Sequence, residues 1–191
     1  NIKEITNIDE KYFFSHLKNK DRDRILLDKL IEVASKDNNQ FIVVIKNGSH
    51  FPYSDKFDLK KFNLNKNSDA KLIYTYSIKE NSINFLRNLL SKLKKESDII
   101  YLSDHGQLFK KKKLSHCNSS NPEIQEWEIP LLYYINNKNK PINVTSNLDL
   151  YDFIIDKMGY TNKTNINKKN KLFYGNLNKR LSKQIKFKTL K

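Results

Sequence analysis

The stretch IIYLSDHG at residues 99–106 decides how the rest of the chain is interpreted. Four apolar or aromatic residues are followed, after Ser103, by Asp104, His105 and Gly106. A short, continuous apolar run that ends in a turn signal is typical of a buried strand in a parallel sheet. Open α/β sheets bind their ligands just past the carboxyl ends of such strands. The stretch therefore places a carboxylate and an imidazole where this class of fold carries its chemistry.

The adjacent side chains of Asp104 and His105 have the donor types that zinc and similar divalent ions accept as ligands. The same two residues are also common in an ordinary turn, where an aspartate bonds to the nearby backbone. The residues alone leave both interpretations open, a pair of metal ligands and a loop turn.

A second apolar run, FIVVI at residues 41–45, is followed by NGSH at residues 47–50. Gly48 permits a sharp turn after this run. If both apolar runs form parallel strands, His50 lies over the same edge of the sheet as Asp104. A helical pattern at residues 69–94 separates the two runs, which predicts a right-handed βαβ unit. The alternative for His50 is an ordinary loop residue.

The remaining elements complete an α/β pattern. Asp21 or Asp23 can cap a helix whose apolar positions extend to Ala34. We expect a third strand at residues 131–135, a helix at residues 148–158 closed by Gly159, and a short edge strand at residues 172–175. The predicted fold class is α/β, with a mostly parallel sheet and helices on both faces.

The length and composition indicate one domain, or a large piece of one, without a membrane span. The chain has 191 residues, of which 38% are hydrophobic, and contains no apolar run approaching the roughly 18 residues that cross a bilayer. It begins with Asn1 rather than Met, so we expect a processed or truncated product from which a membrane or signal segment could have been removed. The single Cys117 excludes an internal disulfide.

The chain is strongly basic, with 36 Lys and Arg residues against 21 Asp and Glu residues and a net charge of +15. Such an excess suits an anionic membrane surface, a phosphorylated substrate or nucleic acid. Nearly all of it is lysine, so the guanidinium groups that read phosphates and bases are scarce, and we expect no specific nucleic-acid partner. The four lysines at residues 110–113 form either a solvated loop or a contact for an anionic substrate.

The order of these motifs resembles a known family. After FIVVIKNGSHFPY (residues 41–53) and IIYLSDHG come His116, EIQEWEIPLLYYI (residues 123–135) and KMGY (residues 157–160). Together they resemble the carboxyl-terminal part of the catalytic domain of sulfatase-like phosphoethanolamine transferases, in the alkaline phosphatase superfamily. We therefore expect residues 1–160 to be that part of an alkaline phosphatase-like domain, and residues 161–191 to be a basic Asn/Lys-rich tail.

The resemblance implies a zinc-dependent enzyme at the periplasmic face of the bacterial inner membrane. Asp104 and His105 match the family's metal-ligand pair, and His50 and His116 match histidines that contact the transferred phosphoryl group or protonate the leaving group. Phosphatidylethanolamine would be the donor, and lipid A or another anionic surface glycan the acceptor. Membrane association would come from a segment upstream of this chain.

The sequence also departs from the family's pattern. No motif for the family's threonine nucleophile occurs in residues 1–40, Gln107 replaces a usual glutamate, and Asn84 stands where an aspartate is common. We therefore expect this segment alone to be inactive. Two alternatives remain: a sulfatase or phosphodiesterase of the same superfamily, and a catalytically inactive remnant that acts as a basic anion-binding module.

Overall fold

In the computed structural model the chain divides into two compact units, Asn1–Ser97 and Asp98–Lys191. The structure describes residues 8–36, 39–93, 96–110, 123–126, 128–136, 138–144, 147–160, 171–174 and 186–189. No helix in these ranges is both long enough and apolar enough to span a bilayer.

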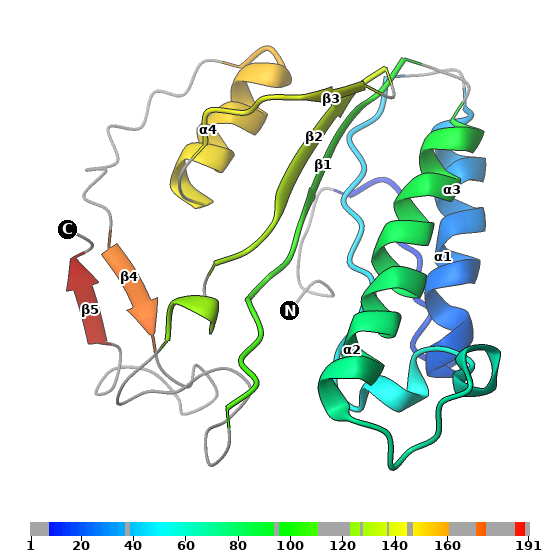
Figure 1. The fold of residues 1–191 in the computed structure, drawn as a ribbon. Helices are drawn as coiled ribbons and strands as arrows, with labels where there is room; N and C mark the ends of the chain where they lie inside the picture. Colours follow the sequence, from blue (N-terminus) through cyan, green and yellow to red (C-terminus); the bar gives the residue numbers. More distant parts are fainter. Residues whose placement is uncertain are drawn as a thin grey trace. The chain divides into compact units, whose positions relative to one another are not determined.

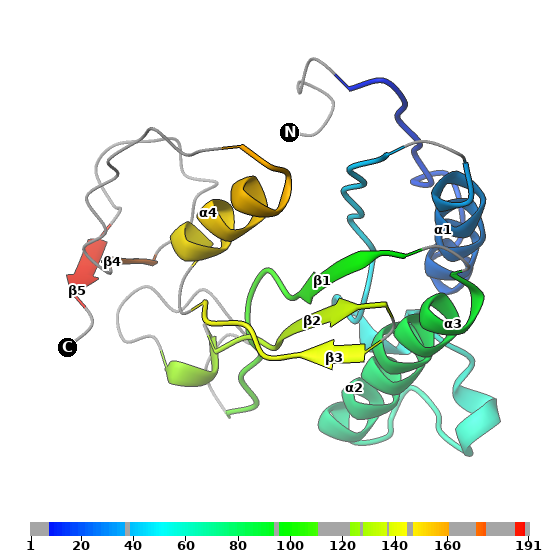
Figure 2. The same ribbon diagram turned by 90° about the horizontal axis from the view of Figure 1, so that it is seen from above.

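Helices dominate the first unit, and α1 lies beside α3 in both ribbon views (Figures 1 and 2). The predicted helix at residues 69–94 is confirmed, because α2, a π-helical turn and α3 follow one another without a break. Asp69 caps its start by accepting a hydrogen bond from the Leu72 backbone N–H at 2.9 Å. The elements of this unit are α1 (Asn19–Ala34), 3₁₀ turns at Tyr53–Asp55 and Leu59–Phe62, α2 (Ala70–Ile78), the π turn Lys79–Ile83 and α3 (Asn84–Lys92).

Replacing Asp69 with alanine is expected to lower the free energy of unfolding by about 1 kcal/mol, because the N–H of Leu72 loses its side-chain acceptor. Urea denaturation followed by circular dichroism measures this change. Asp28→Ala is the matched control, since Asp28 is an exposed residue in the middle of α1 and its loss is expected to change stability by no more than about 0.5 kcal/mol. Equal effects of the two substitutions would contradict the capping role.

The start of α1 differs from the prediction. Its N-cap is Lys18, which makes no side-chain capping bond, so the expected cap by Asp21 or Asp23 is wrong. Asp21 lies in the first turn, whereas Asp23 points inward and is only 6% exposed. The carboxylate of Asp23 bonds to a different part of the chain, which explains why it does not cap its own helix.

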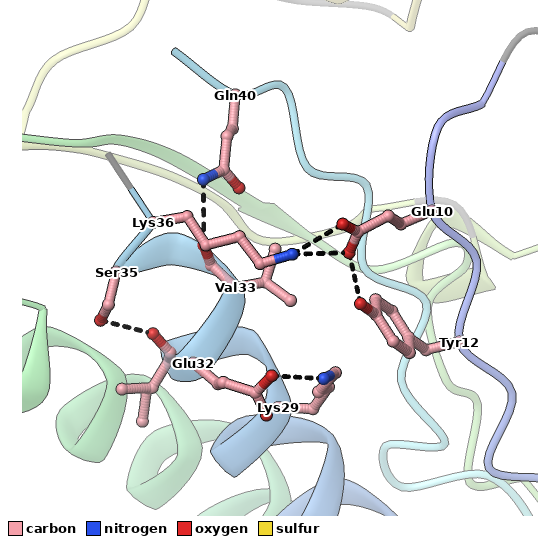
Figure 3. A network of polar contacts seen from close by, with 9 residues as sticks. Glu10, Tyr12, Lys29, Glu32, Val33, Ser35, Lys36 and Gln40 are labelled. Atoms are coloured by element: carbon pink, nitrogen blue, oxygen red, sulfur yellow. Dashed lines mark hydrogen bonds and ion pairs between the residues drawn. The ribbon is translucent and has the colours of Figure 1, made fainter. Parts of the chain in front are cut away.

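A network of exposed polar side chains ties the segment before α1 to the carboxyl end of that helix (Figure 3). The ammonium group of Lys36 lies 2.7 and 2.9 Å from the two carboxylate oxygens of Glu10, and the hydroxyl of Tyr12 donates to the same carboxylate. The hydrogen bond from Lys36 lowers the pKa of Glu10, and the same bond raises the pKa of Lys36. These contacts fix the path of the segment. Because they are solvent-exposed, they add little to the free energy of unfolding.

The apolar run at residues 41–45 does not form the predicted buried strand. The structure assigns it no strand, and its side chains are largely exposed, with Phe41 at 61%, Val43 at 71% and Ile45 at 65%. The predicted βαβ unit therefore does not form in the described residues. A continuous apolar run indicates a tendency to be buried, but it does not supply the partner strand.

The second unit contains a small antiparallel sheet in the order β1–β2–β3 (Figure 2). Strand β1 (Asp98–Leu102) pairs with β2 (Leu131–Ile135), with Ile100 opposite Tyr133, and β2 pairs with β3 (Lys138–Lys140). The predicted positions of β1 and β2 are confirmed, but the predicted mostly parallel sheet with helices on both faces is wrong. The described part of the chain is a mixed α/β fragment whose sheet is antiparallel.

Helix α4 (Asn147–Lys157) packs on this sheet, because the ring of Phe153 meets that of Tyr133 edge to face with centroids 5.1 Å apart. The helix ends as predicted at Gly159, whose φ of 78° is in the left-handed region that favours glycine. The predicted edge strand appears as β4 (Lys171–Tyr174), paired antiparallel with β5 (Lys186–Thr189).

Candidate functional site

The turn after β1 brings Asp104 and His105 together. The carboxylate of Asp104 is 88% exposed, and its Oδ1 accepts a hydrogen bond from the His105 backbone N–H at 3.1 Å. The same oxygen lies 3.9 Å from Nε2 of His105. The hydroxyl of Ser103 closes the turn by donating to the His105 carbonyl at 2.8 Å. The two predicted metal ligands thus point their donor atoms toward the same region.

The tautomer of His105 suits metal binding. Its Nδ1 lies 2.7 Å from the Gly106 carbonyl oxygen, which can only accept, so Nδ1 carries the proton. In the neutral ring Nε2 then holds the lone pair that a metal needs. Metal-bound histidines commonly donate their other ring N–H to a backbone carbonyl in this way, which fixes the orientation of the ring.

The separation of the two donor atoms also fits one zinc ion. Zinc lies about 2.0–2.2 Å from nitrogen and oxygen ligands, so two ligands of a tetrahedral site are about 3.4 Å apart. Nε2 of His105 and Oδ1 of Asp104 are 3.9 Å apart, and a small side-chain rotation of the exposed aspartate closes that difference. The pair therefore fits as half of a zinc site.

The described residues do not complete such a site. Among them, no group of three or more His, Cys, Asp or Glu side chains lies close enough to hold a metal ion. His116, the other histidine predicted for this region, lies outside the described residues. Structural and catalytic zinc sites use three or four protein ligands, so a working site needs donors beyond Asp104 and His105.

A 3₁₀ turn (Ile124–Glu126) bonds to the turn that carries Asp104 and His105. The Gly106 N–H donates to the Glu126 carbonyl at 2.8 Å. A Cβ atom on Gly106 would lie 2.0 Å from the carbonyl oxygen of Gln125, so only glycine allows this approach. The ion pair between Lys110 and Glu123, at 2.9 Å, adds a second link. The position of the turn is therefore fixed by a backbone hydrogen bond, a close backbone approach and a side-chain ion pair.

His50 belongs to the first unit, whereas Asp104 and His105 belong to the second. The His50 side chain is exposed, and its Nδ1 lies 2.7 Å from the Phe51 carbonyl oxygen. As in His105, this contact places the proton on Nδ1 and leaves Nε2 as the acceptor nitrogen of the neutral ring. Such an imidazole can accept a proton or, when charged, donate one.

Buried charges that the sequence did not reveal surround the turn before His50. Asp23 and Lys46 form an ion pair at 3.1 Å with side chains that are 8% and 13% exposed. Lys56, only 4% exposed, donates to the Asn47 side-chain oxygen at 3.2 Å. Burial lowers the pKa of both lysines, and the neighbouring Asp23 opposes this effect. The available signal was the position of Asp23, one helical turn before Leu27 on the apolar stripe of α1.

The chain after His50 enters the core of the first unit. Tyr53, Phe57 and Ile73 form a buried cluster, and the rings of Tyr53 and Tyr74 contact each other at 5.0 Å between centroids. The turn that carries His50 is therefore bonded to a buried charge pair before the histidine and leads into an apolar core after it.

Comparison with known proteins gives one family match. A family model described as Sulfatase matches residues 2–160 of the chain. No curated protein and no solved structure matches it. The matched region includes both candidate turns, at residues 47–50 and 103–106, and ends after α4.

Proposed function

This chain belongs to the sulfatase family, within the alkaline phosphatase superfamily, and from that premise we propose that it supplies part of the active site of a zinc-dependent phosphoethanolamine transferase. The family acts on sulfate and phosphate esters. The assignment to the phosphoethanolamine transferases within this family is supported by the combined motifs NGSH, SDHG and EIQEWEIPLLYYI, whose order resembles that of the transferases.

The turn formed by Asp104 and His105 carries this proposal. Its two donor atoms fit half of a zinc site, and the Nδ1–H of His105 is held by a backbone carbonyl. When bound there, zinc would polarise a phosphoryl oxygen and lower the pKa of a nucleophile. Asp104 and His105 would hold that ion, and the further ligands and the nucleophile would come from outside the described residues.

We assign the two remaining histidines to the transferred group. His50 is exposed and carries an acceptor nitrogen, which suits hydrogen bonding to a phosphoryl oxygen or proton transfer to a leaving oxygen. His116 is assigned the same type of role on the basis of the sequence alone. In this proposal, each histidine acts on the substrate and neither is a metal ligand.

The net charge of +15 supports an anionic donor and acceptor. We propose phosphatidylethanolamine as the donor and lipid A or a related surface glycan as the acceptor. The enzyme would work at the periplasmic face of the bacterial inner membrane, held there by a segment upstream of this chain. Lysine-rich surfaces are attracted to anionic lipids, which would concentrate the domain at its substrates.

The test uses the natural gene product that contains this chain, in vesicles of phosphatidylethanolamine and lipid A. Mass spectrometry should detect lipid A that has gained phosphoethanolamine. The wild type should also leave an aryl sulfate ester intact. Hydrolysis of that sulfate ester without transfer would overturn the proposal in favour of a sulfatase, and inactivity on both substrates would overturn it as well.

A pair of histidine variants tests the role of His50 in the same assay. His50→Ala is expected to lower the transfer rate by about 100-fold, because general acid–base groups contribute that much or more. His16→Ala is the matched control, since His16 is exposed and lies before α1, and it should retain the wild-type rate. Equal rates for the two variants would remove His50 from the site.

A further inference from the structure

Hydrogen bonds from three helical segments hold the four residues that precede His50. The first set comes from α1, where Asp23 accepts from the backbone N–H groups of Asn47 and Gly48, each at 2.8 Å. Each of the two carboxylate oxygens accepts one of these hydrogen bonds, so the aspartate binds the peptide backbone in a bidentate manner. Hydrogen bonds to an ionised acceptor are stronger than neutral ones.

The second set of contacts balances the buried charge. Lys46 pairs with Asp23 and also donates to the backbone carbonyl of Asn81 in the π turn. Lys56, which follows the first 3₁₀ turn, donates to the side chain of Asn47. Removing the Asp23 charge would leave a buried ammonium without its counter-charge, which is unfavourable in a desolvated environment.

The third contact comes from α2. Ser77 has no exposed surface, and its hydroxyl donates to the hydroxyl of Ser49 at 2.9 Å. The side chain of Asn81 donates in turn to Ser77 at 3.3 Å. Gly48 completes the turn with a φ of 56°, in the left-handed region. Each residue from Lys46 to Ser49 is thus fixed, and His50 is the first exposed residue after them.

We propose that Asp23 is a positioning residue, which sets the place and orientation of the His50 imidazole through the backbone of Asn47 and Gly48. The catalytic consequence of this positioning rests on the function proposed above for His50. The positioning itself is a property of the described first unit and can be measured without turnover. Preorganisation of this kind keeps a reacting group within the narrow range of geometry that catalysis needs.

The experiment compares Asp23→Asn with Asp28→Asn in the 191-residue chain. Asp28 is the matched control, because it lies on the same helix but its side chain is 57% exposed. Amide hydrogen exchange should lose about tenfold or more protection at Asn47 and Gly48 in the first variant only. NMR of ¹³C-labelled histidine rings should show the His50 signal shifted and the His16 signal unchanged.

A purely structural role for Asp23 would give a different result. If the amides of Asn47 and Gly48 lost protection while the His50 ring signal stayed at its wild-type position, the positioning role would be wrong. Should Asp23→Asn fail to fold, the double variant with Lys46→Met replaces it, because this variant leaves no unpaired ammonium at position 46. Lys46→Met alone keeps both hydrogen bonds that Asp23 accepts from the backbone, and it should leave the His50 signal in place.

Activity of the natural gene product separates this inference from the proposed function. Asp23→Asn should lower kcat about tenfold with little change in KM, since the substrate still binds but His50 is misplaced. A wild type without transferase activity, together with a shifted His50 signal in the variant, would overturn the proposed function and support the positioning. An active wild type with an unshifted signal in the variant would overturn the positioning alone.

Discussion

Replacing Gly106 with alanine is expected to destabilise the second unit by about 3 kcal/mol, at the upper end of the range for overpacking. The added Cβ would lie 2.0 Å from the carbonyl oxygen of Gln125 and 3.0 Å from that of Glu128. Both neighbours are backbone atoms, so they cannot rotate away as a flexible side chain would. The hydrogen bond from the Gly106 N–H to Glu126 would be strained by the same displacement.

Denaturant unfolding of the 191-residue chain measures this effect, with hydrogen exchange in β1 and β2 reporting on the second unit. Gly159→Ala serves as the comparison, because a Cβ there meets no atom within 4 Å and only the φ of 78° is unfavourable. We expect that variant to lose about 1 kcal/mol. A Gly106→Ala protein as stable as the wild type would show that the turn is not held in this position.

The largest effect on activity is expected from Asp104→Ala and His105→Ala, each of which should lower phosphoethanolamine transfer by about 100-fold or more. A bound metal ion contributes several kcal/mol of transition-state stabilisation, and each 1.4 kcal/mol or so corresponds to a factor of ten in rate. The assay is transfer to lipid A by the natural gene product.

Asp156→Ala controls for the loss of a carboxylate in the same unit, because Asp156 is exposed near the end of α4. This variant should transfer at the wild-type rate. Full activity in Asp104→Ala would remove the aspartate from the proposed site, whatever the behaviour of the other variants.

The sequence predicted the local elements of this chain better than their pairing. The runs that became β1 and β2 were recognisable because they are short, apolar and bounded by turn residues. Their antiparallel pairing was not recognisable, since side-chain pattern indicates burial rather than strand direction. The same limit explains residues 41–45, whose apolar side chains are exposed and which form no assigned strand.

The candidate site was also predictable from the sequence only in part. Adjacent residues such as Asp104 and His105 share a turn because the chain itself joins them, so the sequence could predict their proximity. The contact between Asp23 and Asn47 joins residues 24 positions apart and depends on how α1 packs. The sequence offered Asp23, together with Asp21, as a helix cap because that role is common for an aspartate near a helix start. Its burial became evident only in the folded unit.

Zinc content is the most direct measurement of the central claim that Asp104 and His105 bind a catalytic metal. Metal analysis of the purified natural gene product should find about one zinc ion per chain, as expected for a single catalytic site. Asp104→Ala and His105→Ala should each lose most of that zinc, and His16→Ala should retain it. Unchanged zinc content in Asp104→Ala and His105→Ala would contradict the account.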